Sequence, residues 1–351
     1  MSNFSELKNN PRLKEIYEQR LQILRFTREF FWSQNFVEAE TPIALHLPGQ
    51  EPYLNPMPVE FVDPQKVSYK FYLRTSPEYA LKKLLAVGYQ KVFEIGKCFR
   101  NEESFGGTHN PEFTMIEWYR APGTYLDFMD DTENLFKYVG QKLKVEKLKY
   151  RNLEIEYLNT WDRLSVKDLW QKYLQVNLDD YLSVESMRKL VQANGLAVEV
   201  KDEYEDLFYK LFLNKIEPNL GIDRPIFICD YPAQMCSLSK LCEHDPRYAQ
   251  RAELYIGGLE LANGFGELTD SKMQRFNLEK DQALRGQLGK EVWPIDEDFI
   301  KALDSLKPAF AEASARQGGI ALGVDRMVVL FTEARDIDEV IFQSVADQLG
   351  N

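Results

Sequence analysis

The chain has 351 residues, of which 44% are hydrophobic and 28% charged, as in an ordinary soluble globular protein. Its formal net charge of -12 opposes non-specific binding to a phosphate backbone, and the sequence has no basic patch to offset it. The amino-terminal stretch MSNFSELKNNPRLKE is polar, and no apolar run reaches the roughly 18 residues of a membrane span. We therefore expect a cytoplasmic protein that contacts neither a membrane nor long nucleic acids.

The first third of the chain predicts a long helix, a loop, a short helix and two strands. Apolar residues recur at helical spacing from Leu13 to Phe36, and Pro42 argues against further helix. After the proline-rich loop LPGQEPYLNPMPVEF, Ser76 is the expected N-cap of a short helix, with Pro77 at its first position and Gly88 at its end. VFEIGKCFR and EFTMIEWYR alternate between polar and apolar residues and predict two strands.

The rest of the chain mixes helices and strands. Helical patterns dominate from Leu126 to about Leu213, with breaks near Trp161 and Gly195. PIFICDYP predicts a buried strand, AELYIGGLELANGFGEL a second hairpin, and the charged stretch after it a helix through Lys290. GGIALGVDRMVVLF predicts a strand that leads into a helix. Because we find no repeat and no linker composition, we expect one α+β domain over residues 1–351.

The second predicted strand places a carboxylate among large side chains. Side chains alternate across a strand, so Phe113, Met115, Glu117 and Tyr119 share one face. A carboxylate there is costly without a cationic partner, which leaves two interpretations: a structural salt bridge or wet sheet edge, or a pocket floor that binds a ligand ammonium. Arg100, at the end of the preceding strand, offers planar donors for a carboxylate or phosphate.

The second hairpin carries further carboxylates. A two-residue turn at Gly257 and Gly258 would pair Tyr255 with Glu260. Glu253 and Glu260 then project from one face as oxygen donors that suit Mg²⁺.

The residues after this pair alternate onto the opposite face of a regular strand, namely Asn263, Phe265 and Glu267. A β-bulge at Asn263-Gly264 would bring them into the same site as the two carboxylates.

The last strand–helix segment contains an arginine where a helix begins. Asp325 is the expected N-cap, which places Arg326 in the first turn. A cation there opposes the helix dipole by roughly 0.3–1 kcal/mol, which indicates a nearby anion such as phosphate. The alternative is a surface arginine that reaches back to solvent.

The cysteines give little support for a metal site. None of Cys98, Cys229, Cys236 and Cys242 forms a C-x-x-C pair. Cys236, Cys242 and His244 are close in sequence, but no fourth zinc ligand is evident, so we expect reduced thiols without zinc.

Taken in order, these segments resemble the three motifs of class II aminoacyl-tRNA synthetases of the lysyl branch. The long helix before Pro42 resembles motif 1, which forms the dimer interface in that family. FRNEE…HNPEFTMIEWY resembles motif 2, GIALGVDRMVVLF motif 3, and ELANGFGEL the strand of the lysine pocket. The resemblance runs from about Leu13 to the end of the chain. It implies a class II catalytic core with a mainly antiparallel sheet flanked by helices, which uses ATP and Mg²⁺ and forms a homodimer.

The resemblance also implies roles around the nucleotide. Arg100 would contact both the amino-acid carboxylate and the α-phosphate, Arg326 would contact the γ-phosphate, and Phe113 would stack on adenine. The residues that would hold the rest of the nucleotide are Glu102, His109 and Asn110. The Mg²⁺ ligands would be Glu253 and Glu260.

At the amino-acid end, the resemblance assigns Glu78, with Ser76 nearby, to the backbone-type amine of the substrate. Glu267 and Tyr119 would receive the distal ammonium of a lysine-like side chain. The supporting residues would be Glu117, Asn263 and Phe265. Adenylation needs in-line attack on the α-phosphorus and charge neutralisation by arginine and metal, but no protein nucleophile.

Two departures from the tRNA-charging branch favour a different acceptor. That branch carries an anticodon-binding barrel before motif 1, whereas here motif 1 begins near Leu13. Such a shortened chain resembles the ligases that activate (R)-β-lysine and attach it to a lysine side chain of elongation factor P. Ala321 stands where the tRNA-charging branch has glycine. Its methyl would crowd an α-amine and leave room for a β-amine, an effect of roughly 1–3 kcal/mol.

We therefore expect ATP-dependent transfer of lysine or β-lysine to elongation factor P. A truncated lysyl-tRNA synthetase, charging tRNA or another small acceptor, is the alternative. A catalytically silent paralogue that only binds is the third interpretation. The sequence does not predict tRNA as a partner.

Overall fold

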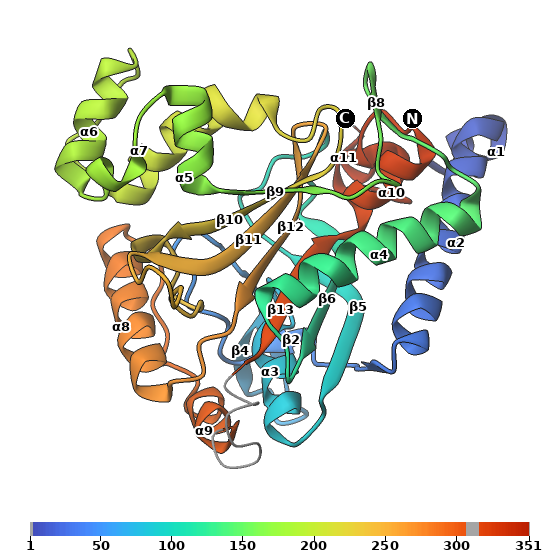
Figure 1. Ribbon diagram of the computed structural model, residues 1–351. Coiled ribbons are helices and arrows are strands. Elements are labelled where there is room, and N and C mark those ends of the chain that lie inside the picture. Colours follow the sequence, from blue (N-terminus) through green and yellow to red (C-terminus); the bar gives the residue numbers. More distant parts are fainter. Residues whose placement is uncertain (1–2, 307–315, 351) are drawn as a thin grey trace.

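The computed structural model describes residues 3–306 and 316–350. The largest sheet has eight strands and carries helices on its faces (Figure 1). In order across the sheet, the strands are β1 (Val37–Glu38), β5 (Lys91–Phe99), β6 (Glu112–Arg120), β13 (Gly318–Gly323), β12 (Leu259–Gly266), β11 (Tyr248–Ile256), β10 (Ile226–Pro232) and β9 (Asp162–Ser165). The two outermost pairs are parallel and the others antiparallel. This confirms the predicted α+β fold with a mainly antiparallel sheet.

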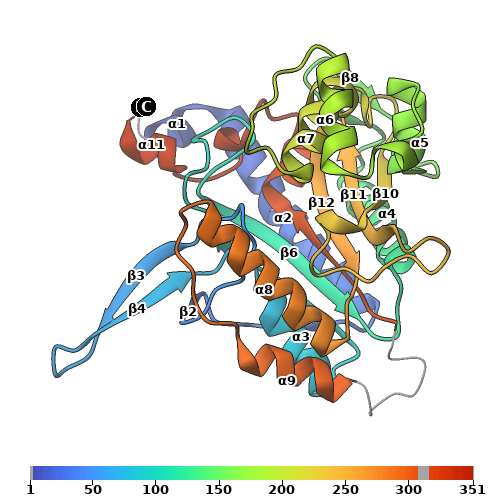
Figure 2. The same cartoon turned by 90° about the vertical axis from the view of Figure 1, so that its left-hand side faces the viewer.

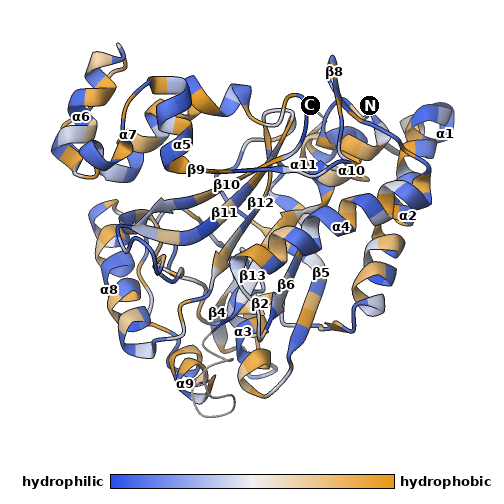
Figure 3. Ribbon diagram, viewed as in Figure 1, coloured by the Kyte–Doolittle hydropathy of each residue, from blue (hydrophilic) through white to orange (hydrophobic). Residues whose placement is uncertain are grey.

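One face of the sheet is covered by α2 (Pro11–Ser33), α4 (Tyr125–Leu143) and α10 (Val324–Thr332) (Figure 1). Their apolar stripes join the main core, where the ring of Phe31 lies 4.9 Å from that of Phe93 and 5.0 Å from that of Trp118. The helices alternate hydrophobic and hydrophilic positions (Figure 3), as expected for elements with one buried face. Trp118 projects to this side, so its strand neighbours Glu117 and Tyr119 project to the other.

The opposite face carries α3 (Glu78–Ala86), α8 (Ser271–Gln287) and α9 (Glu297–Leu306). Here the rings of Tyr79 and Phe299 stack at 4.1 Å, which fixes α3 against α9. A third group covers the β9–β10 edge: α5 (Val166–Leu169), α6 (Val184–Ala193) and α7 (Tyr204–Leu211), with a separate core around Trp170 and Phe208.

Two segments depart from the sequence prediction. The proline-rich segment was expected to be a loop, but its end forms β3 (Met57–Val62), which pairs with β4 (Ser68–Leu73) and projects from the body with it (Figure 2). Pro58 is tolerated because β3 is an edge strand with β4 as its one partner in the sheet β2 (Ala44–Leu45), β4, β3. Within the region predicted as helical, β7 (Leu148–Tyr150) and β8 (Leu153–Ile155) form a short hairpin.

Two helix starts were also predicted wrongly. The helix α3 begins at Glu78 rather than Pro77, although the Ser76 hydroxyl still accepts a hydrogen bond from the Glu78 backbone N–H at 2.9 Å. The N-cap of α10 is Gly323, not Asp325. Asp325 lies inside the first turn because its buried carboxylate pairs with Arg20.

The second hairpin has the predicted turn, with Tyr255 opposite Glu260. Its bulge falls at Leu261 and not at Asn263-Gly264, because Leu254 pairs with Ala262 while Tyr255 pairs with Glu260. One extra residue therefore precedes Asn263 and rotates it onto the face of Glu260.

No helix in residues 3–306 or 316–350 is long and apolar enough to cross a bilayer.

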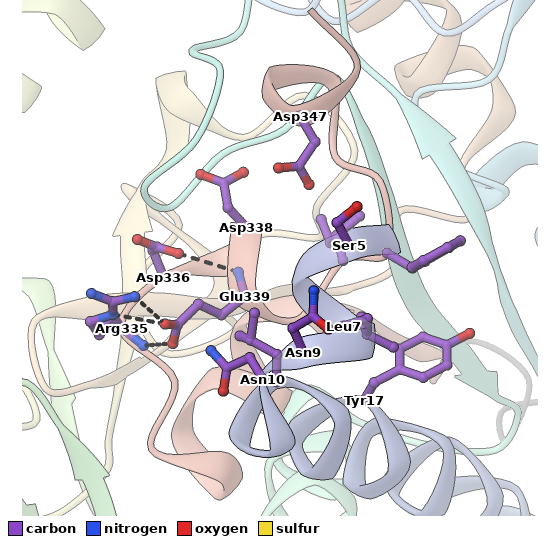
Figure 4. A pocket seen from close by; sticks show the side chains of 13 residues that line it. Ser5, Leu7, Asn9, Asn10, Tyr17, Arg335, Asp336, Asp338, Glu339 and Asp347 are labelled. Atoms are coloured by element: carbon purple, nitrogen blue, oxygen red, sulfur yellow. Dashed lines mark hydrogen bonds and ion pairs between the residues drawn. The ribbon is translucent and has the colours of Figure 1, made fainter. Parts of the chain in front are cut away.

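A cavity of about 440 Å³ lies where α1 (Asn3–Asn9) and the start of α2 meet the segment that leads to α11 (Val345–Leu349) (Figure 4). There Arg335 pairs with Glu339 at 2.6 Å, and the Glu339 backbone N–H donates to Asp336 at 3.3 Å. No predicted site residue lines this cavity.

Candidate active site

A larger cavity of about 1180 Å³ opens on the sheet face formed by β6, β11, β12 and β13. Most of the predicted site residues line it: Ser76, Glu78, Arg100, His109, Asn110, Phe113, Glu117, Tyr119, Glu260, Asn263, Phe265, Ala321 and Arg326. Three do not, namely Glu102, Glu253 and Glu267. The sheet thus brings together residues that lie more than two hundred positions apart in the chain.

One end of the cavity offers two arginines. The Arg100 guanidinium lies over the Phe113 ring at 5.1 Å from its centre. Its Nε is buried and has no hydrogen-bond partner among the described residues. A buried charged donor without a partner is costly, and an anionic oxygen in the cavity would satisfy it.

The second arginine, Arg326, is held at the first turn of α10. It donates to the backbone oxygens of Glu260 at 2.6 Å and Thr108 at 3.2 Å, and its Nη2 lies 3.0 Å from His109 Nε2. Burial, reinforced by the positive charge of Arg326, lowers the pKa of His109. A neutral imidazole can therefore accept from Arg326 and fix its direction.

Two residues assigned to the nucleotide have other contacts in this structure. Glu102 is exposed, adopts a left-handed φ of 62° and accepts from Asn55 at 2.7 Å, whereas its neighbour Glu103 lines the cavity. Asn110 is buried, and its Oδ1 accepts from the Val345 backbone at 3.1 Å. Glu103 went unnoticed in the sequence, although it directly follows the predicted residue.

The predicted metal ligands differ in availability. The Glu253 carboxylate pairs with Arg251 at 2.5 Å and accepts from the hydroxyls of Tyr231 at 2.5 Å and Tyr255 at 2.8 Å. The Glu260 carboxylate lines the cavity and has no hydrogen-bond partner among the described residues. Burial, followed by repulsion from Glu253, raises the pKa of Glu260 to about 7.

An unpaired carboxylate with a raised pKa fits a divalent cation, which supplies the missing positive charge. Glu260 thus fits a metal as it stands. Glu253 would have to exchange its contact with Arg251 for the ion.

At the other end of the cavity, Glu117 is held by two hydroxyls. Ser76 donates to its Oε2 at 2.7 Å and Tyr119 to its Oε1 at 2.8 Å. Burial and then the nearby Glu78 raise the pKa of Glu117 to about 7. A substrate ammonium near this carboxylate would stabilise its ionised form.

The sequence prediction missed Lys82, which lies between the carboxylates of Glu78 and Glu267. Lys82 is 2% exposed, and its Nζ is 2.5 Å from Glu78 Oε1 and 2.5 Å from Glu267 Oε2. Burial is the largest influence on Glu267 and raises its pKa to about 8, against the opposing effect of Lys82. The i,i+4 spacing of Glu78 and Lys82 was the signal in the sequence that could have revealed this pair.

The wall between the two ends is β13. Ala321 pairs with Glu117 on one side and Asn263 on the other, so it lies beside the end of the cavity that contains Glu117. Gly319 pairs with Tyr119, and a Cβ at this position would lie 2.1 Å from the Tyr119 ring. The glycine is therefore required for the ring to lie where it does.

The cysteine and histidine residues considered for zinc do not form one cluster. Among the described residues, Cys242 and His244 gather with Asp230, their possible ligand atoms all within 4.8 Å of one another, whereas Cys236 is not part of the group. His244 is mostly exposed and Cys242 donates to Asp230 at 3.4 Å.

Comparison with known proteins gives the class first. The family described as tRNA synthetases class II (D, K and N) matches residues 2–344, and the chain belongs to this family. Ligases of this class use ATP and generally a divalent metal.

The curated relatives narrow the assignment. The elongation factor P–(R)-beta-lysine ligase of Proteus mirabilis is 36% identical over 92% of this chain and 93% of the relative. That of Pseudoalteromonas translucida is 37% identical over 92% and 93%. The lysine–tRNA ligase of Clostridium tetani is 34% identical over 95% of this chain, which spans 64% of that longer relative. The protein is thus a ligase of the branch that contains the elongation factor P–(R)-beta-lysine ligases.

Proposed function

We propose that the protein activates lysine or (R)-β-lysine with ATP as an aminoacyl-adenylate and transfers it to a lysine side chain of elongation factor P. The observation that carries this proposal is the division of one cavity into two ends. One end presents Arg100 and Arg326 for anionic oxygens, and the other gathers Glu78 and Glu117, with Glu267 close to both, for ammonium groups.

In the first step, a carboxylate oxygen of the amino acid attacks the α-phosphorus and the bond to pyrophosphate breaks. Arg100, which lines the cavity beside Phe113, would neutralise both the carboxylate and the α-phosphate. Arg326, whose orientation is supported by its contact with His109, would neutralise the terminal phosphate. Phe113 supplies an aromatic face for adenine, and Glu102, His109 and Asn110 remain the proposed nucleotide residues. Mg²⁺, held by Glu260 and Glu253, would neutralise charge on the phosphates.

In the second step, the neutral amine of the acceptor lysine attacks the carbonyl carbon of the adenylate. AMP leaves, the amine loses a proton, and an amide forms. No nucleophilic side chain of the protein is needed for either step.

We further propose that the protein works in the cytoplasm as a homodimer of single catalytic domains. The outer face of α2 supports the dimer, because Leu21 and Trp32 are 50% and 51% exposed on a helix whose other side is buried.

The 34% sequence identity to the lysine–tRNA ligase of Clostridium tetani supports tRNA charging as a second candidate function. ATP–pyrophosphate exchange with each lysine isomer tests adenylation, and parallel transfer assays with elongation factor P and tRNA separate the acceptors. Charging of tRNA without transfer to elongation factor P would refute the first candidate. Glu267→Gln should mainly impair amino-acid use, because a neutral side chain is a weaker partner for an ammonium.

A further inference from the structure

The amino-acid end of the cavity holds more negative than positive charge. Glu78, Glu117 and Glu267 are each at least nine-tenths buried, and Lys82 is the cation that the structure places against them. Three carboxylates and one ammonium leave two negative charges when all four groups are ionised. An amino acid with two ammonium groups balances that charge, whereas a substrate with one does not.

The Lys82 ammonium contacts one oxygen of each of two carboxylates. Its Nζ meets Oε1 of Glu78 and Oε2 of Glu267. Glu267 Oε1 is buried without a hydrogen-bond partner among the described residues. Such an acceptor requires a donor, and none of the residues that the structure describes supplies one.

The position of Lys82 is fixed by its surroundings. The side chain is 2% exposed, and its Nζ lies 5.8 Å from the centre of the Tyr119 ring and 6.0 Å from that of Phe299. A lysine buried beneath the cavity between two carboxylates and two rings is part of the site's framework.

We propose that Lys82 is a positioning residue of the amino-acid pocket: its ammonium bridges Glu78 and Glu267 and leaves one oxygen of each for the two ammonium groups of a diamino acid. This inference rests on the proposed function and adds the residue that selects for substrates with two ammonium groups. Without Lys82, the two carboxylates would repel each other in a buried site and would bind protons in place of substrate.

The test compares Lys82→Met and Lys82→Arg with the wild-type protein in ATP–pyrophosphate exchange, between about pH 6 and pH 9. The titratable groups facing Glu267 are Glu78, Lys82, Glu117 and Tyr119, and Glu51 also acts on Glu78, so these charges set the pH profile. Lys82→Met should raise KM for lysine or β-lysine about tenfold or more, leave KM for ATP within about twofold, and move the profile to higher pH. Lys82→Arg, which keeps the charge, should keep the wild-type profile.

The matched control is Lys83→Met. Lys83 is the next residue of α3, but it is partly exposed and pairs with Asp296 at 2.6 Å, so its removal should leave the amino-acid KM unchanged. Norleucine, which lacks the distal ammonium, serves as a probe of selectivity. Lys82→Met should narrow the preference for lysine over norleucine.

An unchanged or lower KM for lysine in Lys82→Met would show that Lys82 is dispensable or is displaced by substrate, and would overturn the inference. A wild-type protein without exchange would instead refute the proposed function. In that case chemical unfolding tests whether Lys82 bridges Glu78 and Glu267. The free energy of unfolding lost in Lys82→Met should increase as pH rises, because the two carboxylates must then ionise without their cation. A loss of stability in Lys82→Met that does not depend on pH would overturn the inference.

Discussion

The ion pair between Arg20 and Asp325 links all three synthetase motifs, and removing one of its partners should strongly destabilise the protein. Arg20 Nη1 lies 2.6 Å from Asp325 Oδ1, with side-chain exposures of 8% and 5%. Arg20 also donates to the Thr114 hydroxyl at 2.9 Å, and Asp325 accepts from the Thr114 backbone N–H at 2.7 Å. These contacts join α2, β6 and α10 directly behind Arg326.

Arg20→Leu would leave the Asp325 carboxylate buried without its cation. Removing one partner of a buried pair costs about 3–5 kcal/mol, because the desolvated charge is no longer compensated. An exposed pair on the same helix gives the matched control: Arg25 is 74% exposed and pairs with Glu29 at 2.7 Å. Arg25→Leu should cost no more than about 1 kcal/mol.

Urea unfolding followed by tryptophan fluorescence measures both losses. The double variant Arg20→Leu/Asp325→Asn should be more stable than Arg20→Leu alone, since the amide carries no charge to bury. A loss below about 1 kcal/mol in Arg20→Leu, or a double variant no more stable than that single one, would refute the reasoning.

Three further predictions concern the amino-acid end. Gly319→Ala should displace the Tyr119 ring, break its 2.8 Å bond to Glu117 and raise the amino-acid KM about tenfold or more in exchange assays, with the KM for ATP unchanged. Ala321→Gly should raise the ratio of α-lysine to β-lysine exchange rates, by up to the roughly 10–200-fold that one methyl can supply; an unchanged ratio would remove Ala321 from the selectivity argument. Burial raises the pKa of Glu267 from 4.5 to about 8, so the folded state holds a proton that the unfolded state releases, and stability falls as pH rises through this window. Glu267→Gln should flatten that fall in unfolding experiments, and an unaltered slope would contradict the assignment.

Local signals in the sequence predicted the strands and the turn well. The alternation of Glu112–Arg120 and the Gly257-Gly258 turn appear in the structure with the expected pairing. The bulge was predicted at Asn263-Gly264, two residues after its actual position at Leu261, because glycine is a weak marker of where an extra residue is accommodated.

The errors arose where distant contacts override local preference. Asp325 has the sequence of an N-cap, yet Arg20, some three hundred residues away, draws it into a buried ion pair. Glu267 was assigned to the substrate without its partner Lys82, because the pairing of two helix residues with a strand end depends on tertiary structure. Glu253 likewise matches a metal ligand by position, while Arg251 on the same strand engages it here.

The central claim is the transfer of an activated diamino acid to a protein, and intact-mass spectrometry of elongation factor P tests it most directly. After incubation with this protein, ATP, Mg²⁺ and (R)-β-lysine or lysine, elongation factor P should gain the mass of one lysyl unit on a single lysine. An unmodified factor, in a reaction where the same preparation forms lysyl-tRNA, would contradict the account.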